Sequence, residues 1–502
     1  MGRRDAHPGW SNALGDDLQA FDAYLASIER TVDFIRAFEG GLSGSPVLLV
    51  RDRIGDNLPR QRILKLCRTD DEPDRIAVAY QAAPQGFRAA HMAAPEHTRK
   101  LDGCSLIFMD VAGNDLENCR PLADLLHRPN LASVCRKIVF SLLKDWNSNS
   151  AEIERPYTVA EFLQILLGSS RLAAGGPLAD FAARARIDMN AETVLRQGWA
   201  RELRNPFILA DPGTAAGKSL VPGGALVGKG HGDLSVFNLL IPTYPRTEPK
   251  KYQIIDYGGY SSRRPVTWDS MYLLVSLATR WLSGMNPASD PAKGLLLSLA
   301  DHRTDRERFG LREHHAVIKA LFEAGHAWAQ DKTYGDRWLP QCALSLCAAG
   351  LIFIGRRIPG LEGSIDDWLF ELAATAAQDF VEQTGIPVGV TDLSSYRERR
   401  NSKRGVEDTD AVALLRHLEE AEFDCTDWLG LTRGVTGLRA FLREQRHLVI
   451  ESPHAVRIRT LITALEEALE AADDPRLEPV AFERAVDRLK RIAGTLLTLL
   501  LG

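Results

Sequence analysis

Two short runs near the middle of the sequence contain the residue types best suited to chemistry. The first is HGDLSVFN, residues 231–238, and the second is DYG, residues 256–258. Phosphoryl transfer to a hydroxyl needs a carboxylate near the attacking oxygen and oxygen ligands that hold Mg²⁺ against the phosphates of a nucleotide. Asp233, Asn238 and Asp256 supply side chains of these kinds. The apolar runs FNLLI and YQIID beside them predict a β-hairpin that brings the three groups together.

These two runs resemble the motifs of a known superfamily. The first is similar to the catalytic loop H-x-D-x-x-x-x-N of kinases, in the H-G-D form typical of aminoglycoside phosphotransferases and choline kinases, and the second resembles their D-x-G metal motif. The resemblance implies that Asp233 is the catalytic base or hydroxyl-orienting group, and that Asn238 and Asp256 ligate the metal. It also implies structural roles for His231, which would brace the loop, and for Asp269, which would anchor it from the next helix. The alternative interpretation is a surface turn with chance spacing, and two ordered motifs beside apolar strands argue against it.

The amino-terminal part of the chain supports the same resemblance. Gly40, Gly41, Ser43 and Gly44 resemble the looser form of the family's glycine-rich loop, in which backbone N–H groups approach phosphates. Lys65, within RILKLC, resembles the nucleotide-binding lysine of the third strand. The alternatives are an ordinary glycine turn and a solvated strand lysine.

Two further features of the resemblance concern the adenine site and the partner of the lysine. The run FMDVAG resembles the hinge between kinase lobes, in which backbone groups of about Asp110 to Ala112 would bind the adenine edge; an interior strand that leads into a turn is the alternative. The family usually pairs its lysine with a helix glutamate. Glu72, at a helix cap before a proline, and Glu96, after another proline, are both unclear matches, so the partner of Lys65 stays open.

The coarse element pattern predicts an α+β fold. We expect a helix over residues 17–30, three antiparallel strands ending near Lys65, a helix from Pro73 and a buried strand that ends at Gly113. Mostly helices should follow from residue 122 to about 205, and again from 268 to about 382, with a glycine-rich stretch over 211–230 and the hairpin between them. The resemblance implies a two-lobed protein-kinase-like fold. Its expected parts are an amino-terminal helical extension, a small sheet lobe, a large helical lobe, and a separate carboxy-terminal helical module after a basic linker at 394–405; they cover residues 1–31, 32–113, 114–393 and 406–502.

The resemblance implies a magnesium-dependent transfer of the γ-phosphoryl group of ATP or GTP to a hydroxyl. Only GGYSSRRPVTW separates the metal motif from Asp269, which leaves no room for the activation segment of a protein kinase, so a small-molecule acceptor is favoured over a protein. Two other function classes remain open. One is a nucleotide-binding regulator without transferase activity, and the other is an interaction protein that acts on a protein partner through residues 406–502.

Composition limits the partners and the setting. The 502 residues include 61 basic and 66 acidic side chains, for a formal charge of -5, so nothing in the overall charge points to nucleic acid or to a membrane surface. The seven cysteines include no C-x-x-C pair, and no apolar run approaches the roughly 20 residues of a membrane span. We therefore expect a cytoplasmic protein. GTAAGKS, residues 213–219, has one residue too few for a phosphate-binding P-loop and is interpreted as a flexible loop.

Overall fold

The computed structural model describes residues 8–386 of the chain, with gaps at 16–17, 29, 39–45, 56, 68, 70, 102–103, 111–115, 117, 149–151, 154–155, 197–198, 200, 245–246, 301–310, 357 and 359–364. The chain divides into two units, residues 1–390 and 391–502. The linker predicted over 394–405 and the helical module predicted over 406–502 lie outside the described residues. All elements named below belong to the first unit.

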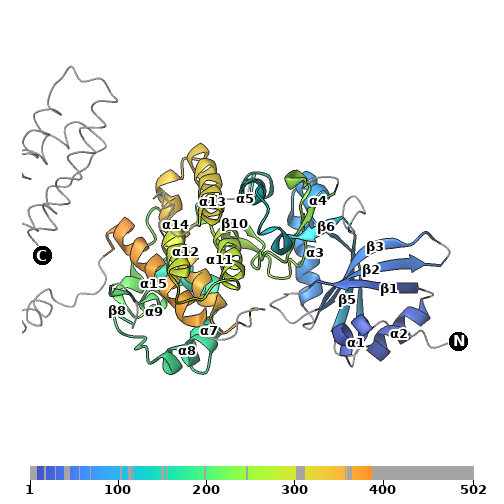
Figure 1. Cartoon of the computed structure of the whole chain (residues 1–502), viewed down its shortest axis with the longest axis horizontal. Helices are drawn as coiled ribbons and strands as arrows, with labels where there is room; N and C mark the ends of the chain where they lie inside the picture. Colours follow the sequence, from blue (N-terminus) through green and yellow to red (C-terminus); the bar gives the residue numbers. More distant parts are fainter. Residues whose placement is uncertain are drawn as a thin grey trace, which may run out of the picture. The chain divides into compact units, whose positions relative to one another are not determined.

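A five-stranded antiparallel sheet forms the amino-terminal part of this unit, with strand order β1-β2-β3-β5-β4 (Figure 1). The strands are β1 (Arg30–Ala37), β2 (Val47–Ile54), β3 (Arg60–Cys67), β4 (Ala94–Leu101) and β5 (Cys104–Asp110). The prediction of three antiparallel strands is confirmed, since β2 pairs with both β1 and β3. Sequence reasoning missed β4, because its polar run APEHTRKL has no apolar alternation. It lies at the edge of the sheet beside β5, where charged residues and an early proline are tolerated.

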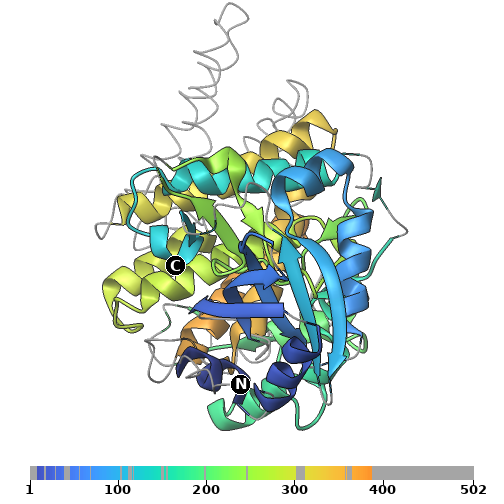
Figure 2. The ribbon, with the colours of Figure 1, turned by 90° about the vertical axis from the view of Figure 1, so that its right-hand side faces the viewer.

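Different helices cover the two faces of this sheet (Figure 2). The helices are α1 (Pro8–Leu14), α2 (Leu18–Ser27), α3 (Glu72–Ala82) and α4 (Gln85–His91). Leu48 of β2 belongs to the same buried cluster as Phe21 of α2, whereas its neighbour Leu49 belongs to the cluster that contains Ile76 of α3. Successive strand side chains point to opposite faces, so the apolar run VLLV supplies both hydrophobic layers.

The remainder of the unit is mainly helical. Its longer helices are α5 (Leu131–Ser141), α6 (Val159–Leu167), α8 (Pro177–Ala185), α11 (Trp268–Leu282), α12 (Asp290–Ala300), α13 (Arg312–Asp331), α14 (Gly335–Phe353) and α15 (Ile365–Thr384). Short helical segments are α7 (Ser169–Leu172), α9 (Pro206–Ala210), α10 (Ala215–Lys218), and turns at Leu122–Leu125, Leu142–Trp146 and Pro249–Lys251. Residues 340–353 of α14 are all buried, and this helix contacts α6, α11, α13 and α15. A helix that is apolar all round forms the centre of a helical core.

Small antiparallel sheets lie within the helical part and carry the chemical motifs. They are β12-β11-β6, β13-β10-β7 and β8-β9, formed by β6 (Cys119–Pro121), β7 (Glu152–Ile153), β8 (Thr193–Val194), β9 (Leu203–Arg204), β10 (Leu226–Gly230), β11 (Leu239–Pro242), β12 (Gln253–Ile254) and β13 (Ser261–Pro265). The hairpin predicted from FNLLI and YQIID is confirmed, because Leu239 of β11 lies opposite Ile254 of β12.

The described part of the chain is thus a mixed α+β fold with small antiparallel sheets and a helical part, as the element pattern predicts. Within residues 8–386, apart from the gaps, no helix is both long enough and apolar enough to cross a lipid bilayer.

Candidate active site

The loop of residues 231–238 connects β10 to β11 and is held from within by a buried histidine. His231 Nδ1 lies 3.2 Å from the backbone nitrogen of Asp233, which donates to it, and Nε2 lies 3.1 Å from the carbonyl oxygen of Ile255. Since Nδ1 accepts a hydrogen bond, the ring proton lies on Nε2 and is donated to Ile255. His231 therefore joins the backbone at Asp233 to the backbone just before Asp256.

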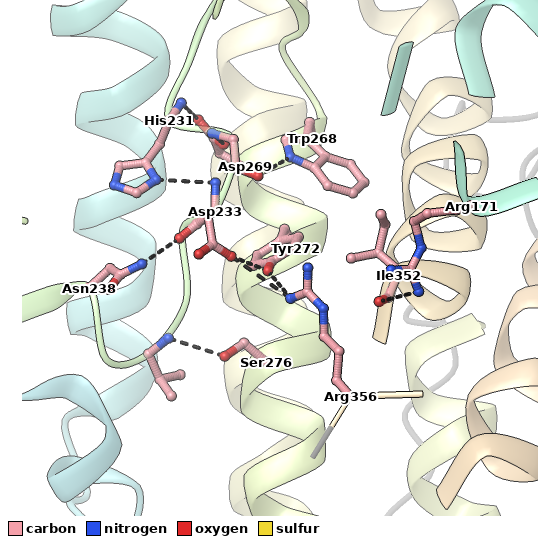
Figure 3. Close-up of polar contacts among 12 residues, drawn as sticks. Arg171, His231, Asp233, Asn238, Trp268, Asp269, Tyr272, Ser276, Ile352 and Arg356 are labelled. Atoms are coloured by element: carbon pink, nitrogen blue, oxygen red, sulfur yellow. Dashed lines mark hydrogen bonds and ion pairs between the residues drawn. The ribbon is translucent and has the colours of Figure 1, made fainter. Parts of the chain in front are cut away.

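The start of α11 anchors the same loop. Asp269 accepts hydrogen bonds from the backbone nitrogens of His231, at 2.7 Å, and Gly232, at 2.9 Å, while the Trp268 indole donates to the carbonyl of Gly232 (Figure 3). These are the contacts that the anchoring role expected of Asp269 requires. Gly232 has a φ of 88°, and a Cβ there would lie 2.1 Å from the carbonyl oxygen of Gly259. The loop therefore needs glycine at this position.

The carboxylate of Asp233 is bound by two residues that sequence reasoning missed. Tyr272 of α11 donates its hydroxyl proton to Asp233 Oδ1, and Arg356 Nη1 donates to the Tyr272 oxygen at 2.5 Å (Figure 3). An arginine can only donate, so the single hydroxyl proton of Tyr272 must point at Asp233. Burial, reinforced by the charge of Asp233, raises the pKa of Tyr272 well above its ordinary value, so the hydroxyl remains a donor. Oδ1 of Asp233 is thereby engaged by the Tyr272 hydroxyl.

The two missed residues differ in how visible they are in the sequence. Tyr272 lies three positions after Asp269 on one helix, so it lies on the same face of that helix, and this spacing is a usable signal. Arg356 is 84 positions from Tyr272, beyond the end of α14, and no local pattern connects the two.

The hairpin brings the two predicted metal ligands together. Asn238 uses its amide nitrogen to donate to the carbonyl of Asp233 at 2.7 Å, which leaves its Oδ1 as the atom able to ligate a cation. The backbone nitrogen of Ile255 donates to the carbonyl of Asn238 at 3.0 Å, so Asp256 follows directly beside it. Asp256 has a φ of 58°, a left-handed conformation that residues other than glycine rarely adopt and that clusters at functional sites.

Lys65 of β3 connects the five-stranded sheet to Asp256. Its Nζ forms an ion pair with Asp256 Oδ1 and a second one, at 2.5 Å, with Glu72 Oε1. Burial by itself lowers the pKa of Lys65, but the negative charges of Asp256 and Glu72 outweigh that effect and raise it. The amine is therefore a cation at neutral pH, held between Asp256 and Glu72.

The glutamate partner that the sequence left open is Glu72, the first residue of α3. The other candidate, Glu96, pairs instead with Arg62. Glu72 was hard to recognise because it lies at the very start of its helix, before Pro73, and not in the helix interior.

Of the remaining residues predicted to bind the nucleotide, the structure describes only Asp110. Asp110 lies at the end of β5 and forms an ion pair with Arg62 at 3.0 Å. Gly40, Gly41, Ser43, Gly44 and Ala112 lie outside the described residues. Their expected contacts with phosphates and adenine stay predictions.

The donor set at Asn238 and Asp256 fits a magnesium ion that shares its shell with a nucleotide. Among the residues that the structure describes, no group of three or more His, Cys, Asp and Glu side chains could hold a metal ion by itself. Asn238 Oδ1 and Asp256 Oδ2 are hard oxygen donors, and Mg²⁺ is usually held by one or two carboxylates together with phosphate oxygens and waters. The chemistry of the two residues thus fits a magnesium ion that takes the rest of its ligands from elsewhere.

Known proteins were compared with this chain by sequence. No protein-family model matches it, and no curated protein does either.

Proposed function

We propose that this chain is a magnesium-dependent phosphotransferase with a two-lobed protein-kinase-like fold, which moves the γ-phosphoryl group of ATP or GTP to a hydroxyl of a small molecule. One observation carries the proposal. Asn238 and Asp256 lie side by side across a hairpin, the Asp233 carboxylate is fixed by Tyr272, and Lys65 is held between Glu72 and Asp256. These are the groups that phosphoryl transfer needs, on elements joined by hydrogen bonds and ion pairs.

Each residue has a defined task in this proposal. Asp233 Oδ2 accepts the proton of the acceptor's hydroxyl group while the hydroxyl oxygen bonds to the γ-phosphorus. The bond between the γ-phosphorus and the oxygen that bridges it to the β-phosphate breaks and releases the nucleoside diphosphate. Lys65 has three N–H donors, and with two directed at Glu72 and Asp256 one remains for a phosphate oxygen. Asn238 and Asp256 would hold Mg²⁺, which, when bound, neutralises charge on the phosphates.

The segment after Asp256 favours a small acceptor. Residues Ser261–Pro265 form β13, which pairs antiparallel with β10, so the middle of the short segment between Asp256 and α11 is a strand of a sheet. A protein substrate of a kinase usually docks on a long activation segment in this part of the chain. The paired strand leaves no such segment.

The alternative of a nucleotide-binding regulator rested on the unclear partner of Lys65. The ion pair of Lys65 with Glu72 removes that support. The alternative of an interaction protein acting through 406–502 concerns residues outside the described part of the chain.

The proposal is tested by separating a metal ligand from a base. The full chain and its Asp256→Asn and Asp233→Asn variants are titrated with a non-hydrolysable ATP analogue, with and without Mg²⁺. Asp256→Asn is expected to weaken magnesium-dependent binding about tenfold or more, since a ligand is lost. Asp233→Asn is expected to spare binding and to abolish transfer. Equal effects of both substitutions on binding, or binding that ignores Mg²⁺, would contradict the assigned roles.

A further inference from the structure

The guanidinium of Arg356 lies beside the oxygen atoms that an acceptor would approach. Its Nη1 is 3.9 Å from Asp233 Oδ1 and donates to Tyr272 at 2.5 Å (Figure 3). The side chains of Arg356 and Asp233 are 24% and 25% exposed, so both remain open to a ligand while the tyrosine between them is buried.

The backbone that carries Arg356 is held from several sides. Arg171 Nη2 donates to carbonyl oxygens at the end of α14, including those of Ile352, at 3.1 Å, and Ile354, at 2.9 Å. Asp366 of α15 accepts a hydrogen bond from the backbone nitrogen of Gly355 at 2.9 Å. Arg356 is therefore presented from a fixed turn and not from a loose surface loop.

Two arginines, Arg264 and Arg356, lie close enough to interact with the charge of Asp233. Burial lowers the pKa of Arg264, and the nearby carboxylates of Asp269 and Asp233 oppose that effect. The pKa of Arg171 is lowered by burial and then by the charge of Arg356. Arg264 and Arg356 thus interact with the charge of Asp233, and Arg171 lies close to Arg356. The second carboxylate near Arg264, that of Asp269, is already occupied by two backbone N–H groups.

Such a setting disfavours a polycationic acceptor. An ammonium group that approached Asp233 would meet Arg356 at close range, and like charges in a partly buried site repel strongly. Conversely, a guanidinium with one nitrogen tied to a neighbour and the others facing an open position binds carboxylate or phosphate oxygens through parallel N–H donors.

We propose that Arg356 binds an anionic group, a carboxylate or a phosphate ester, on the hydroxyl-bearing acceptor of the phosphotransferase. The inference rests on the proposed function and adds to it the class of the substrate. It assigns Arg356 a specificity role: the anionic group docks on the guanidinium and thereby places the neighbouring hydroxyl at Asp233 Oδ2.

The test uses acceptors that share a skeleton and differ in charge. The full chain with Mg–ATP is assayed for acceptor-dependent ADP release with glycerol, glycerate, glycerol 1-phosphate and 3-amino-1,2-propanediol, and with glucose, gluconate, glucose 1-phosphate and glucosamine. In at least one set, kcat/KM is expected to be about tenfold or more higher for an anionic member than for the neutral one, and lowest for the amine. Comparison of the carboxylate-bearing acceptors with the phosphate-bearing acceptors shows which anionic group Arg356 binds.

Variants connect this preference to the residue. Arg356→Gln should reduce the ratio of kcat/KM for the anionic acceptor to kcat/KM for the neutral one to about one. Arg356→Lys, which keeps the charge without the planar guanidinium, should retain part of this preference. Arg136→Gln, which removes an exposed arginine paired with Glu323, should leave the preference unchanged. Thermal unfolding of each variant checks that it is folded.

Three results would overturn the inference. They are a preference for the amine, no stimulation by any of the eight compounds, and an Arg356→Gln variant that loses affinity for the magnesium-bound ATP analogue instead of acceptor selectivity. If the wild-type chain binds the analogue with Mg²⁺ and turns over at least one of the compounds, the first and third results show that only the substrate class is wrong. If it binds the analogue but none of the compounds stimulates ADP release, the result favours a nucleotide-binding regulator, and the proposed transfer fails together with the inference. If the analogue does not bind, the proposed function fails and the inference fails with it.

Discussion

Lys65 and Asp256 lie 191 positions apart in the sequence and form an ion pair that joins the five-stranded sheet to the hairpin. Glu72 shares the same ammonium group at 2.5 Å. The position of the Lys65 ammonium group, which the proposed function assigns to a nucleotide phosphate, therefore depends on both the sheet and the hairpin.

Replacing Lys65 with methionine should destabilise the protein and abolish nucleotide binding. The change leaves the largely buried Glu72 and Asp256 carboxylates without their cation, which costs about 3–5 kcal/mol in comparable pairs. Urea unfolding measures the loss. The control, Arg75→Met, removes an exposed pair with Asp71 and should cost less than about 1 kcal/mol. Equal losses of unfolding free energy in the two variants would show that the buried ion pairs of Lys65 stabilise the protein no more than the exposed pair does.

Replacing Asp233 with alanine should remove turnover without unfolding the loop. In the proposed mechanism the Asp233 carboxylate accepts the proton of the acceptor's hydroxyl and orients the acceptor, so its loss should lower kcat about hundredfold or more. The loop keeps its contacts to Asp269, which use backbone nitrogens and not the Asp233 side chain. Nucleotide turnover in single-substrate assays measures the effect, and an unchanged rate would exclude Asp233 from the mechanism.

Replacing Tyr272 with phenylalanine should lower kcat and spare nucleotide affinity. The variant keeps the ring and loses only the proton donated to Asp233 Oδ1 and the oxygen that accepts from Arg356. Asp233 would then be free to rotate toward Arg356, and misplacement of a base by a small distance costs about ten- to a hundredfold in rate. A rise in KM for the nucleotide with kcat unchanged would contradict a positioning role.

The same tyrosine predicts a dependence of stability on alkaline pH. Burial and the charge of Asp233 raise the pKa of Tyr272 in the folded protein, so the folded state holds this proton more tightly than the unfolded chain. Its contribution is complete below the unfolded pKa of about 10 and is lost as the pH rises toward the folded value. Lys65, whose pKa is also raised, acts in the same direction, so the comparison with Tyr272→Phe isolates the tyrosine. The variant should lose less free energy of unfolding than the wild type above about pH 10.

Replacing Gly232 with alanine should distort the catalytic loop. The new Cβ would lie 2.1 Å from a backbone oxygen, at a φ of 88°, so the loop must shift, at a cost of about 1–3 kcal/mol and with loss of turnover. Gly86→Ala is the matched control, because it lies in α4 with nothing within 4 Å of the added methyl group. The control should be neutral or stabilising by up to about 1 kcal/mol, since alanine favours a helix. Similar stability and turnover of the two variants would show that position 232 does not require glycine.

The local elements around the site were predictable from the sequence. Alternation and turn residues are properties of neighbouring positions, so β1 to β3, the helix that starts near Pro73 and the hairpin that joins Asn238 to Asp256 all follow from short patterns. The motif residues lie on these elements at fixed spacing. The sequence therefore determined which carboxylates and amide converge.

Tertiary structure alone decided which groups surround them. Glu72 rather than Glu96 pairs with Lys65 because the fold brings the start of α3 to the Lys65 ammonium group, whereas Glu96 pairs with Arg62. Arg356 reaches Asp233 because α14 packs against α11. The edge strand β4 forms because β5 offers unpaired backbone groups, although its own sequence has little strand character. These outcomes depend on how whole helices and sheets pack, and packing is set by contacts between positions far apart, which no short pattern in the sequence records.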